Sequence, residues 1–301
     1  MCKSMEVNIA GITFKNPVMT ASGTFQPREC GDYVDMNQLG AVVVKGIASE
    51  PWTGNATPRI AETYGGMLNS VGLQNPGVDV FLQEDLPFLE QCDTKIIVNI
   101  AGRMIQDYCE VAEKLQGTSI AMLELNISCP NIKEGGVAFG TDASMVEKVT
   151  REVKKYCDKP LIVKLSPNVT DITEMARAAV SGGADAISLI NTLLGMVIDV
   201  HQRTPILSTK MGGLSGPAIK PIAVRMVYQV ANAVEVPIIG MGGITTGEDA
   251  IEFILAGADA VAVGTAGLIH PTALTDVVQG IQYYMDRYNV KHIKELRGLV
   301  K

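Results

Sequence analysis

Short apolar runs alternate with segments of helical periodicity along most of this chain. The apolar runs are short and nearly continuous, as strands buried on both faces are. They predict eight strands, over 17–22, 41–46, 95–101, 122–129, 160–166, 186–192, 237–241 and 260–264.

In the segments between these runs, apolar residues recur every three or four positions, which predicts helices. Thr246 followed by Asp249 supplies an acidic first turn, which favours a helix start there. Residues 6–18 alternate and predict a short hairpin before the main fold. The predicted helices cover 104–115, 141–156, 172–180, 222–233, 249–255 and 271–288, followed by a short basic helix from Lys291.

Eight strands alternating with helices predict an α/β fold, a (β/α)8 TIM barrel with an N-terminal hairpin. A doubly wound open sheet is the alternative. It is disfavoured because the glycine-rich segment 240–243 is followed by Thr245 where the dinucleotide-binding fingerprint needs its third glycine. No linker or shift in composition divides the 301 residues, so we expect a single domain over 1–301.

Three connections after strands are longer than a barrel needs, at 48–76, 130–140 and 193–216. In a barrel, the loops that follow the strands all lie on the carboxyl-end face, where active sites are built. We therefore expect extended loops on that face.

Five strands end in polar residues that strand alternation directs into the barrel: Lys45, Asn99, Asn126, Lys164 and Asn191. Buried polar groups need partners, so this ring indicates a ligand. In the alternative, the ring satisfies itself, with Glu124 neutralising Lys164 and the asparagines bonding to the backbone. Two lysines against one interior carboxylate leave a positive surplus, which suits a ligand that carries or develops negative charge.

Glycine clusters mark the ends of the last two strands and the segment before the helix at 222–233. They are Gly240–Gly243, Gly264–Gly267 and Gly212–Gly216. Glycines let backbone N–H groups approach an anion, and the loops after strands seven and eight are where barrels bind phosphate. Ordinary turns are the alternative for each cluster taken alone.

A thiol follows the fourth strand. Pro130 has no N–H to continue the strand and favours an extended backbone at Cys129. Cys129 at the carboxyl end of a strand, between Asn126 and Asn131, is a candidate for chemistry. The alternative is a buried cysteine that acts as a small hydrophobe.

Composition and charge narrow the function classes. The net charge of −7 argues against nucleic acid and anionic membrane as partners. The N-terminus lacks the apolar core of a signal peptide, and no apolar run is long enough to cross a bilayer, so we expect a cytoplasmic protein. No Cys-x-x-Cys unit occurs, which predicts reduced thiols and shows no zinc or iron–sulfur ligand set. The six cysteines are at 2, 30, 92, 109, 129 and 157.

Together these segments resemble the class 1 dihydroorotate dehydrogenases, flavin enzymes of pyrimidine biosynthesis. The similarity covers nearly the whole chain. The matching segments, in the family's order, are Asn69–Asn75 (NSVGLQN), Asn126–Asn131 (NISCPN), Lys164–Asn168 (KLSPN), Ile190–Leu193 (INTL), Gly213–Gly216 (GLSG) and Gly240–Gly243 (GMGG).

The resemblance implies oxidation of dihydroorotate to orotate with one FMN per chain and Cys129 as the general base. It implies FMN contacts from Ser22, Lys45, Gly46, Asn99, Asn126, Lys164, Ile190, Gly216, Gly242, Gly243, Gly264 and Thr265. It implies substrate contacts from Lys45, Asn69, Ser70, Val71, Gly72, Leu73, Asn126, Asn191 and Thr192.

Two runs, 164–171 and 212–221, resemble the NAD-linked class 1B branch in particular. This implies a homodimer of catalytic chains, in a heterotetramer with a subunit that carries FAD and a 2Fe–2S cluster and passes electrons to NAD⁺. Class 2 enzymes have serine in place of Cys129 and an N-terminal membrane segment. Dihydropyrimidine dehydrogenases have His-Gly after their Cys-Pro, where this chain has Asn131-Ile132. The fumarate-dependent class 1A and a phosphosugar-binding barrel enzyme without redox activity remain as alternatives.

Overall fold

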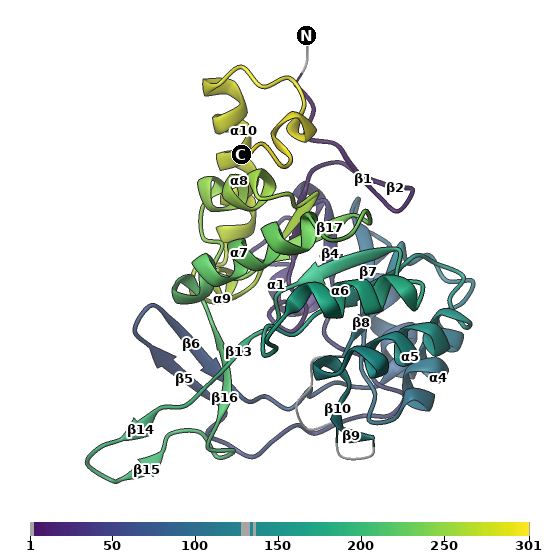
Figure 1. Cartoon of the computed structure of the whole chain (residues 1–301), viewed down its shortest axis with the longest axis vertical. Coiled ribbons are helices and arrows are strands. Elements are labelled where there is room, and N and C mark those ends of the chain that lie inside the picture. The colour runs from purple at the N-terminus through teal and green to yellow at the C-terminus, as the bar shows by residue number, and fades with distance from the viewer. Residues whose placement is uncertain (1–2, 128–132, 135–136, 301) are drawn as a thin grey trace.

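The computed structural model of the chain describes residues 3–127, 133–134 and 137–300. At its centre is a closed barrel of parallel strands, in which each strand pairs with the next along the chain and the last pairs with the first (Figure 1). The barrel strands are β3 (Val18–Thr20), β4 (Ala41–Val43), β7 (Lys95–Ile100), β8 (Met122–Asn126), β11 (Leu161–Lys164), β12 (Ala186–Leu189), β17 (Ile238–Met241) and β18 (Ala260–Val263). The predicted TIM barrel and its eight strands are confirmed.

Helices surround the barrel and pack an apolar stripe against it. In α5, for example, Val146, Val149 and Val153 are buried at intervals of three and four residues. The long helices are α4 (Ile105–Lys114), α5 (Ala143–Lys154), α6 (Ile172–Ser181), α7 (Lys220–Ala231), α8 (Gly247–Leu255) and α10 (Ala273–Arg287). Each lies within two residues of its predicted bounds.

Shorter helices were not predicted, because three to five residues are too few to show a period. They are α1 (Pro27–Cys30), η1 (Met36–Gln38), α2 (Val78–Val80), η2 (Phe81–Asp85), α3 (Leu86–Leu89), η3 (Phe139–Thr141), η4 (Pro217–Ile219) and α9 (Thr265–Ile269). The predicted basic helix near the C-terminus is a 3-10 turn, η5 (Ile293–Leu296). The predicted N-terminal hairpin is present as β1 (Val7–Ile9) and β2 (Ile12–Phe14).

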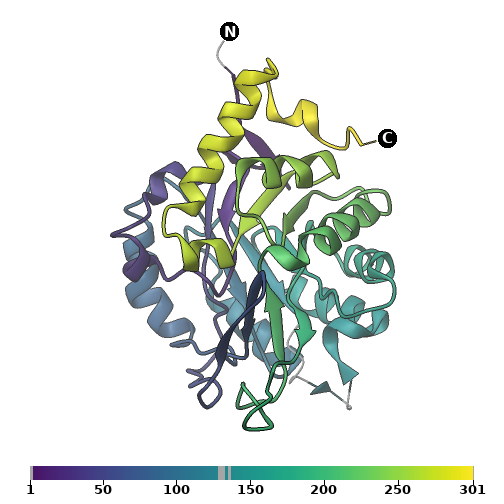
Figure 2. The same ribbon diagram turned by 90° about the vertical axis from the view of Figure 1, so that its left-hand side faces the viewer.

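Two of the three predicted long connections form short strands. They pair with each other in a four-stranded antiparallel sheet of order β13-β16-β6-β5, and a hairpin projects beyond it (Figures 1 and 2). The strands are β5 (Ile60–Thr63), β6 (Gly66–Asn69), β13 (Leu193–Gly195) and β16 (Gly212–Ser215), with β14 (Ile198–Asp199) and β15 (Thr204–Pro205) in the hairpin. The extended connections on this face are as predicted, but their strands were not predicted, because these strands are short and each needs a partner far away in the sequence. The third connection contains a two-stranded ladder, β9 (Lys133–Glu134) and β10 (Val137–Ala138).

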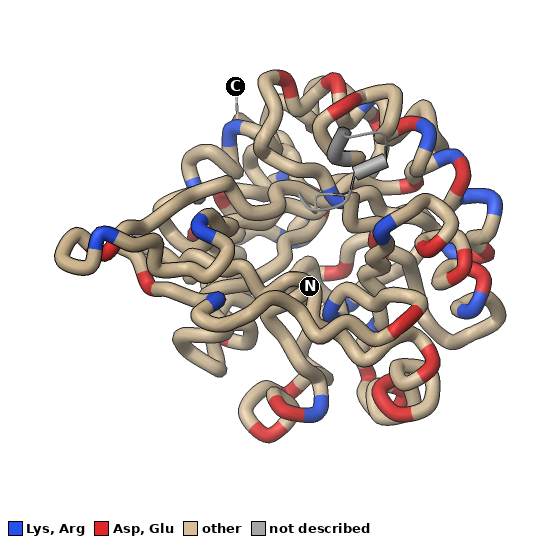
Figure 3. The backbone as a smooth tube through the Cα atoms, turned by 90° about the horizontal axis from the view of Figure 1, so that it is seen from below, with Lys and Arg blue, Asp and Glu red and all other residues tan. Residues whose placement is uncertain are grey.

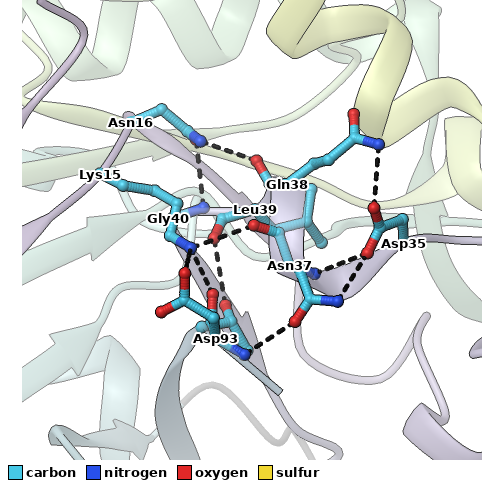
Figure 4. Close-up of polar contacts among 9 residues, drawn as sticks. Lys15, Asn16, Asp35, Asn37, Gln38, Leu39, Gly40 and Asp93 are labelled. Atoms are coloured by element: carbon cyan, nitrogen blue, oxygen red, sulfur yellow. Dashed lines mark hydrogen bonds and ion pairs between the residues drawn. The ribbon is translucent and has the colours of Figure 1, made fainter.

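A polar cluster joins the chain segments that enter β3 and β4 (Figure 4). The Asn16 side chain, 3% exposed, accepts hydrogen bonds from the Val18 and Gly40 amides and donates to the Gln38 carbonyl. A Cβ atom at Gly40 would lie 2.1 Å from the Asn16 carbonyl oxygen, so only glycine fits there. The cluster therefore holds the amino-terminal ends of these two strands together.

Charged residues of both signs are interspersed around the outer edge of the molecule (Figure 3). Over residues 3–127, 133–134 and 137–300, no helix is long and apolar enough to cross a membrane. Cys30, Cys92, Cys109 and Cys157 are free thiols.

Candidate active site

A cavity of about 760 Å³ lies between the carboxyl ends of the barrel strands and the four-stranded sheet. Its volume is within the range of roughly 300–1,000 Å³ that is common for cofactor and ligand sites. Every described residue that the sequence assigned to FMN or to substrate lines this cavity. They are Ser22, Lys45, Gly46, Asn69, Ser70, Val71, Gly72, Leu73, Asn99, Asn126, Lys164, Ile190, Asn191, Thr192, Gly216, Gly242, Gly243, Gly264 and Thr265.

The polar residues at the strand ends form one hydrogen-bonded series. Asn191 donates to Asn126, and Asn126 donates to Asn99, both over 3.4 Å. Asn99 in turn donates to Glu124 over 2.5 Å, and Ser188 donates to the other oxygen of the same carboxylate over 2.7 Å. The ring therefore satisfies itself in part, although through other bonds than the alternative expected: Glu124 accepts from Asn99 and Ser188, and the asparagines bond to one another. Its two bonds of 3.4 Å lie near the long limit for a hydrogen bond and are weak.

Both predicted lysines line the cavity, although they come from strands on different parts of the barrel. Lys164 ends β11, is 5% exposed and donates to the Ser22 hydroxyl over 3.2 Å. Lys45 follows β4, and burial, together with the positive charge of Arg59, lowers the pKa of its ammonium group. A desolvated cation in a cavity is stabilised by an anion, so Lys45 favours a negatively charged ligand.

Glycine backbones form one wall of the cavity. Gly216, Gly242 and Gly243 have φ angles of 100°, 128° and 77°, which other residues adopt only with strain. A Cβ atom at Gly243 would lie 2.9 Å from the Gly216 carbonyl oxygen, so the two turns touch backbone to backbone. On the neighbouring strand end, the Thr265 hydroxyl donates to Ser215 over 2.8 Å. These are the turns at which the sequence predicts an anion site.

The predicted substrate segment begins at the end of β6, where Asn69 pairs with Gly213 of β16. The backbone of Ser70 is held on both sides: its amide donates to the Arg59 carbonyl, and its carbonyl accepts from Asn55. The Ser70 hydroxyl is buried, and it has no hydrogen-bond partner among the residues that the structure describes. A buried hydroxyl without a partner at the cavity wall is a position for a polar ligand atom.

Cys129 lies outside the described residues, so its predicted role as the base stays a prediction. The chain leads to it from Asn126 and Ile127, which both line the cavity.

The sequence prediction missed several polar residues of the cavity wall: Thr24, Asn55, Ser166, Asn168 and Ser215. The Asn168 side chain donates to the Thr192 carbonyl and accepts from the Leu194 amide, so it links the end of β11 to β13. Strand parity extended past Lys164 would have indicated Ser166 and Asn168. Asn55 shows no such signal, because a long connection places it.

Comparison with known proteins identifies the family of this chain. The family model described as dihydroorotate dehydrogenase matches residues 4–285. The chain belongs to the dihydroorotate dehydrogenase family. It is 71% identical over 296 residues to a protein of Alkaliphilus metalliredigens named "Dihydroorotate dehydrogenase B (NAD(+)), catalytic subunit", with 98% of each chain covered. A protein of the same name from Lachnoclostridium phytofermentans is 60% identical, with 98% of this chain and 99% of that protein covered.

The fold of the family is also found in a solved structure. The crystal structure of DHODH from Eimeria tenella in complex with ferulenol has a TM-score of 0.81 to this chain at 25% identity. The similarity covers 98% of this chain and 88% of that one. Within the described residues of this chain, no group of three or more His, Cys, Asp or Glu side chains could hold a metal ion.

Proposed function

We propose that this dihydroorotate dehydrogenase is the catalytic subunit of the NAD-linked, class 1B type and oxidises dihydroorotate to orotate in pyrimidine biosynthesis. One observation carries the proposal: the FMN and substrate positions expected from the family, in so far as they are described, line one cavity. The names of the relatives from Alkaliphilus and Lachnoclostridium support the NAD-linked type.

The residues present fit FMN. The Gly216, Gly242 and Gly243 turns, with Gly264 and Thr265, would hold the phosphate through backbone N–H groups. Lys164, Asn99 and Asn126 would face the polar edge of the flavin ring, where a fixed cation stabilises negative charge. Ser22, Lys45, Gly46 and Ile190 complete the proposed FMN contacts. FMN, when bound, would supply the acceptor for the hydride that leaves the substrate.

The substrate carries a carboxylate and ring amides, and the remaining wall offers groups that match them. Lys45 would pair with the substrate's negative charge. This attraction would offset the desolvation that lowers the pKa of Lys45. Asn126, Asn191 and Thr192 offer amide and hydroxyl groups to the ring. Backbone and side-chain groups of the segment from Asn69 through Ser70, Val71 and Gly72 to Leu73 would close over it, with the Ser70 hydroxyl gaining a partner.

Cys129 would take the proton from the carbon next to a substrate carbonyl. An ordinary thiol has a pKa of about 8.5, so only a small fraction is thiolate at neutral pH. The rate of proton removal should therefore rise towards alkaline pH.

Electrons would leave through a partner. We propose a homodimer of this chain in the cytoplasm, joined in a heterotetramer to a subunit that carries FAD and a 2Fe–2S cluster and reduces NAD⁺. The words "catalytic subunit" in the relatives' name support a separate electron-transfer chain.

The test is the visible spectrum of the purified chain before and after anaerobic addition of dihydroorotate. We expect a flavin spectrum that bleaches with substrate. A colourless chain that cannot be loaded with FMN would contradict the proposal and favour a phosphosugar-binding barrel. Fumarate turnover by the isolated chain, with no NAD⁺ reduction when the partner subunit is supplied, would instead favour the class 1A type.

A further inference from the structure

An ion pair lies behind the glycine wall of the cavity. Lys220 is the first residue of α7, and its ammonium group contacts Asp249 of α8 over 2.6 Å. Neither of these residues lines the cavity, whereas Gly216 and Pro217, just before Lys220, and Thr245, near Asp249, do. The pair therefore joins two cavity-lining turns on the side that faces away from the cavity.

The Asp249 carboxylate also holds the turn that follows β17. One oxygen, Oδ1, accepts from Lys220, while Oδ2 accepts from the Thr245 amide, the Thr245 hydroxyl and the Thr246 amide over 2.7–2.9 Å. Burial alone would raise the pKa of Asp249, but these donors lower it to about 2. The carboxylate is therefore ionised, and able to accept all of these bonds, at every physiological pH.

The turns at Gly216 and Gly243 are in close contact with each other. A Cβ atom at Gly243 would lie 2.8 Å from the Lys220 Cβ atom and 2.9 Å from the Gly216 carbonyl oxygen. Since backbone meets backbone here, a movement of α7 relative to α8 would change the distance between Gly216 and Gly243 directly. The Lys220–Asp249 contact opposes that movement.

We propose that Lys220 and Asp249 are positioning residues that hold the Gly216 and Gly242–Gly243 turns at the spacing needed to bind the phosphate of FMN. The inference rests on the proposed function, because it takes FMN as the ligand. It adds that affinity for the phosphate depends on two residues that do not touch it.

Lys220 offers its own matched control. The same ammonium group contacts Glu252 over 2.6 Å, but Glu252 makes no described contact with the 242–246 turn. Glu252→Gln removes an ion pair of the same length from the same lysine and leaves the turn in place. Lys220→Arg keeps the charge and is the conservative variant.

The experiment compares FMN with riboflavin, which lacks the phosphate. The protein is freed of flavin, and dissociation constants for both flavins are measured by fluorescence quenching. Lys220→Met and Asp249→Asn should weaken FMN binding about tenfold, as expected for the loss of one charge-assisted hydrogen bond. Riboflavin affinity should stay within about twofold of the wild type, since the ring site lies elsewhere. Glu252→Gln and Lys220→Arg should bind both flavins as the wild type does.

Equal losses for FMN and riboflavin, or no loss in either variant, would overturn the inference. So would a wild-type protein that binds the two flavins equally. A wild-type protein that binds neither flavin would instead contradict the proposed function. Should Asp249→Asn fail to fold, Lys220→Met against Lys220→Arg still tests the inference, because Lys220 does not line the cavity.

Discussion

Asn99 on β7 donates a hydrogen bond of 2.5 Å to the carboxylate of Glu124 on β8. Because a carboxylate only accepts, this bond orients the Asn99 amide with its nitrogen towards Glu124 and its oxygen towards Asn126. Glu124 is 2% exposed and Asn99 is fully buried. A buried carboxylate therefore determines which polar atom a cavity-lining asparagine presents to its neighbours.

Replacing Glu124 tests this arrangement through stability. Glu124→Leu removes the acceptor of both Asn99 and Ser188. We expect the free energy of unfolding to fall by about 2–4 kcal/mol, since each buried donor that loses its partner costs about 1–3 kcal/mol. In Glu124→Gln the amide oxygen can still accept from Asn99 while the Ser188 hydroxyl turns to accept, so the loss should be clearly smaller. Urea unfolding of both variants measures it; equal losses would show that charge, not hydrogen bonding, is what matters at this position.

Lys45→Met should weaken substrate binding and at the same time raise the stability of the fold. At neutral pH the variant loses the cation proposed for the substrate's negative charge, so the substrate dissociation constant should rise at least about tenfold. The variant should also be more stable than the wild type, because the lowered pKa of Lys45 means that burial disfavours its charged form.

The sign of the pH dependence follows from the direction of that shift. Between the lowered pKa of Lys45 and the ordinary value of 10.5, the unfolded chain binds more protons than the folded one. The wild type therefore gains stability relative to Lys45→Met as the pH rises through this window, and the difference between them shrinks. Thermal unfolding at several alkaline pH values measures this; a difference that grows with pH would contradict it.

Gly243→Ala should impair FMN binding beyond the effect of backbone strain. Gly243 has a φ of 77°, and a Cβ atom there meets Lys220 and Gly216 at 2.8–2.9 Å. Gly117 has a φ of 69° with open space around it, so Gly117→Ala carries similar strain without the clash. Gly117→Ala should cost roughly 1–2 kcal/mol of stability from strain alone, and Gly243→Ala should cost more because of the clash. Only Gly243→Ala should lower FMN affinity, by about tenfold or more, in a fluorescence titration; similar affinities for the two variants would rule out the backbone contact as a requirement.

Asn16→Ala should destabilise the protein and leave its ligand site intact. Asn16 makes three hydrogen bonds at the amino-terminal ends of β3 and β4 (Figure 4), two of them buried, and their loss should cost about 2–3 kcal/mol. Gln38→Ala is the control, because Asn16 uses only the backbone carbonyl of Gln38. We expect the control to change the unfolding free energy by less than about 0.5 kcal/mol. FMN affinity should be the same in both, and a loss of affinity in Asn16→Ala would show that the cluster influences the opposite end of the barrel.

Cys129→Ala should slow the bleaching of bound flavin by dihydroorotate at least about 100-fold, as expected when a general base is removed. Cys92→Ala removes a free thiol that does not line the cavity and should leave the rate unchanged. Stopped-flow absorbance under anaerobic conditions gives both rates. A near-normal rate in Cys129→Ala would remove this thiol from the mechanism.

The sequence alone determined the barrel and much of its cavity. Apolar runs with helical segments between them predict eight strands in the right places, and the alternation of side chains along a strand points Lys45, Asn99 and Lys164 inward. These are local properties, since the period of a strand or helix depends on neighbouring residues. The glycine turns at 216 and 242–243 are local for the same reason, because glycine adopts a positive φ with less strain than other residues do.

Only the tertiary structure decided which distant groups meet. The sheet over the cavity pairs Asn69 with Gly213, which lie 144 residues apart in the sequence. The local sequence of either strand does not indicate which strand it pairs with. The same holds for the Asn99–Glu124 bond and for the Lys220–Asp249 pair behind the glycine wall. Such contacts form because closure of the barrel brings the ends of successive strands and the starts of successive helices together. The local sequence pattern around each residue does not show which distant residue it will contact.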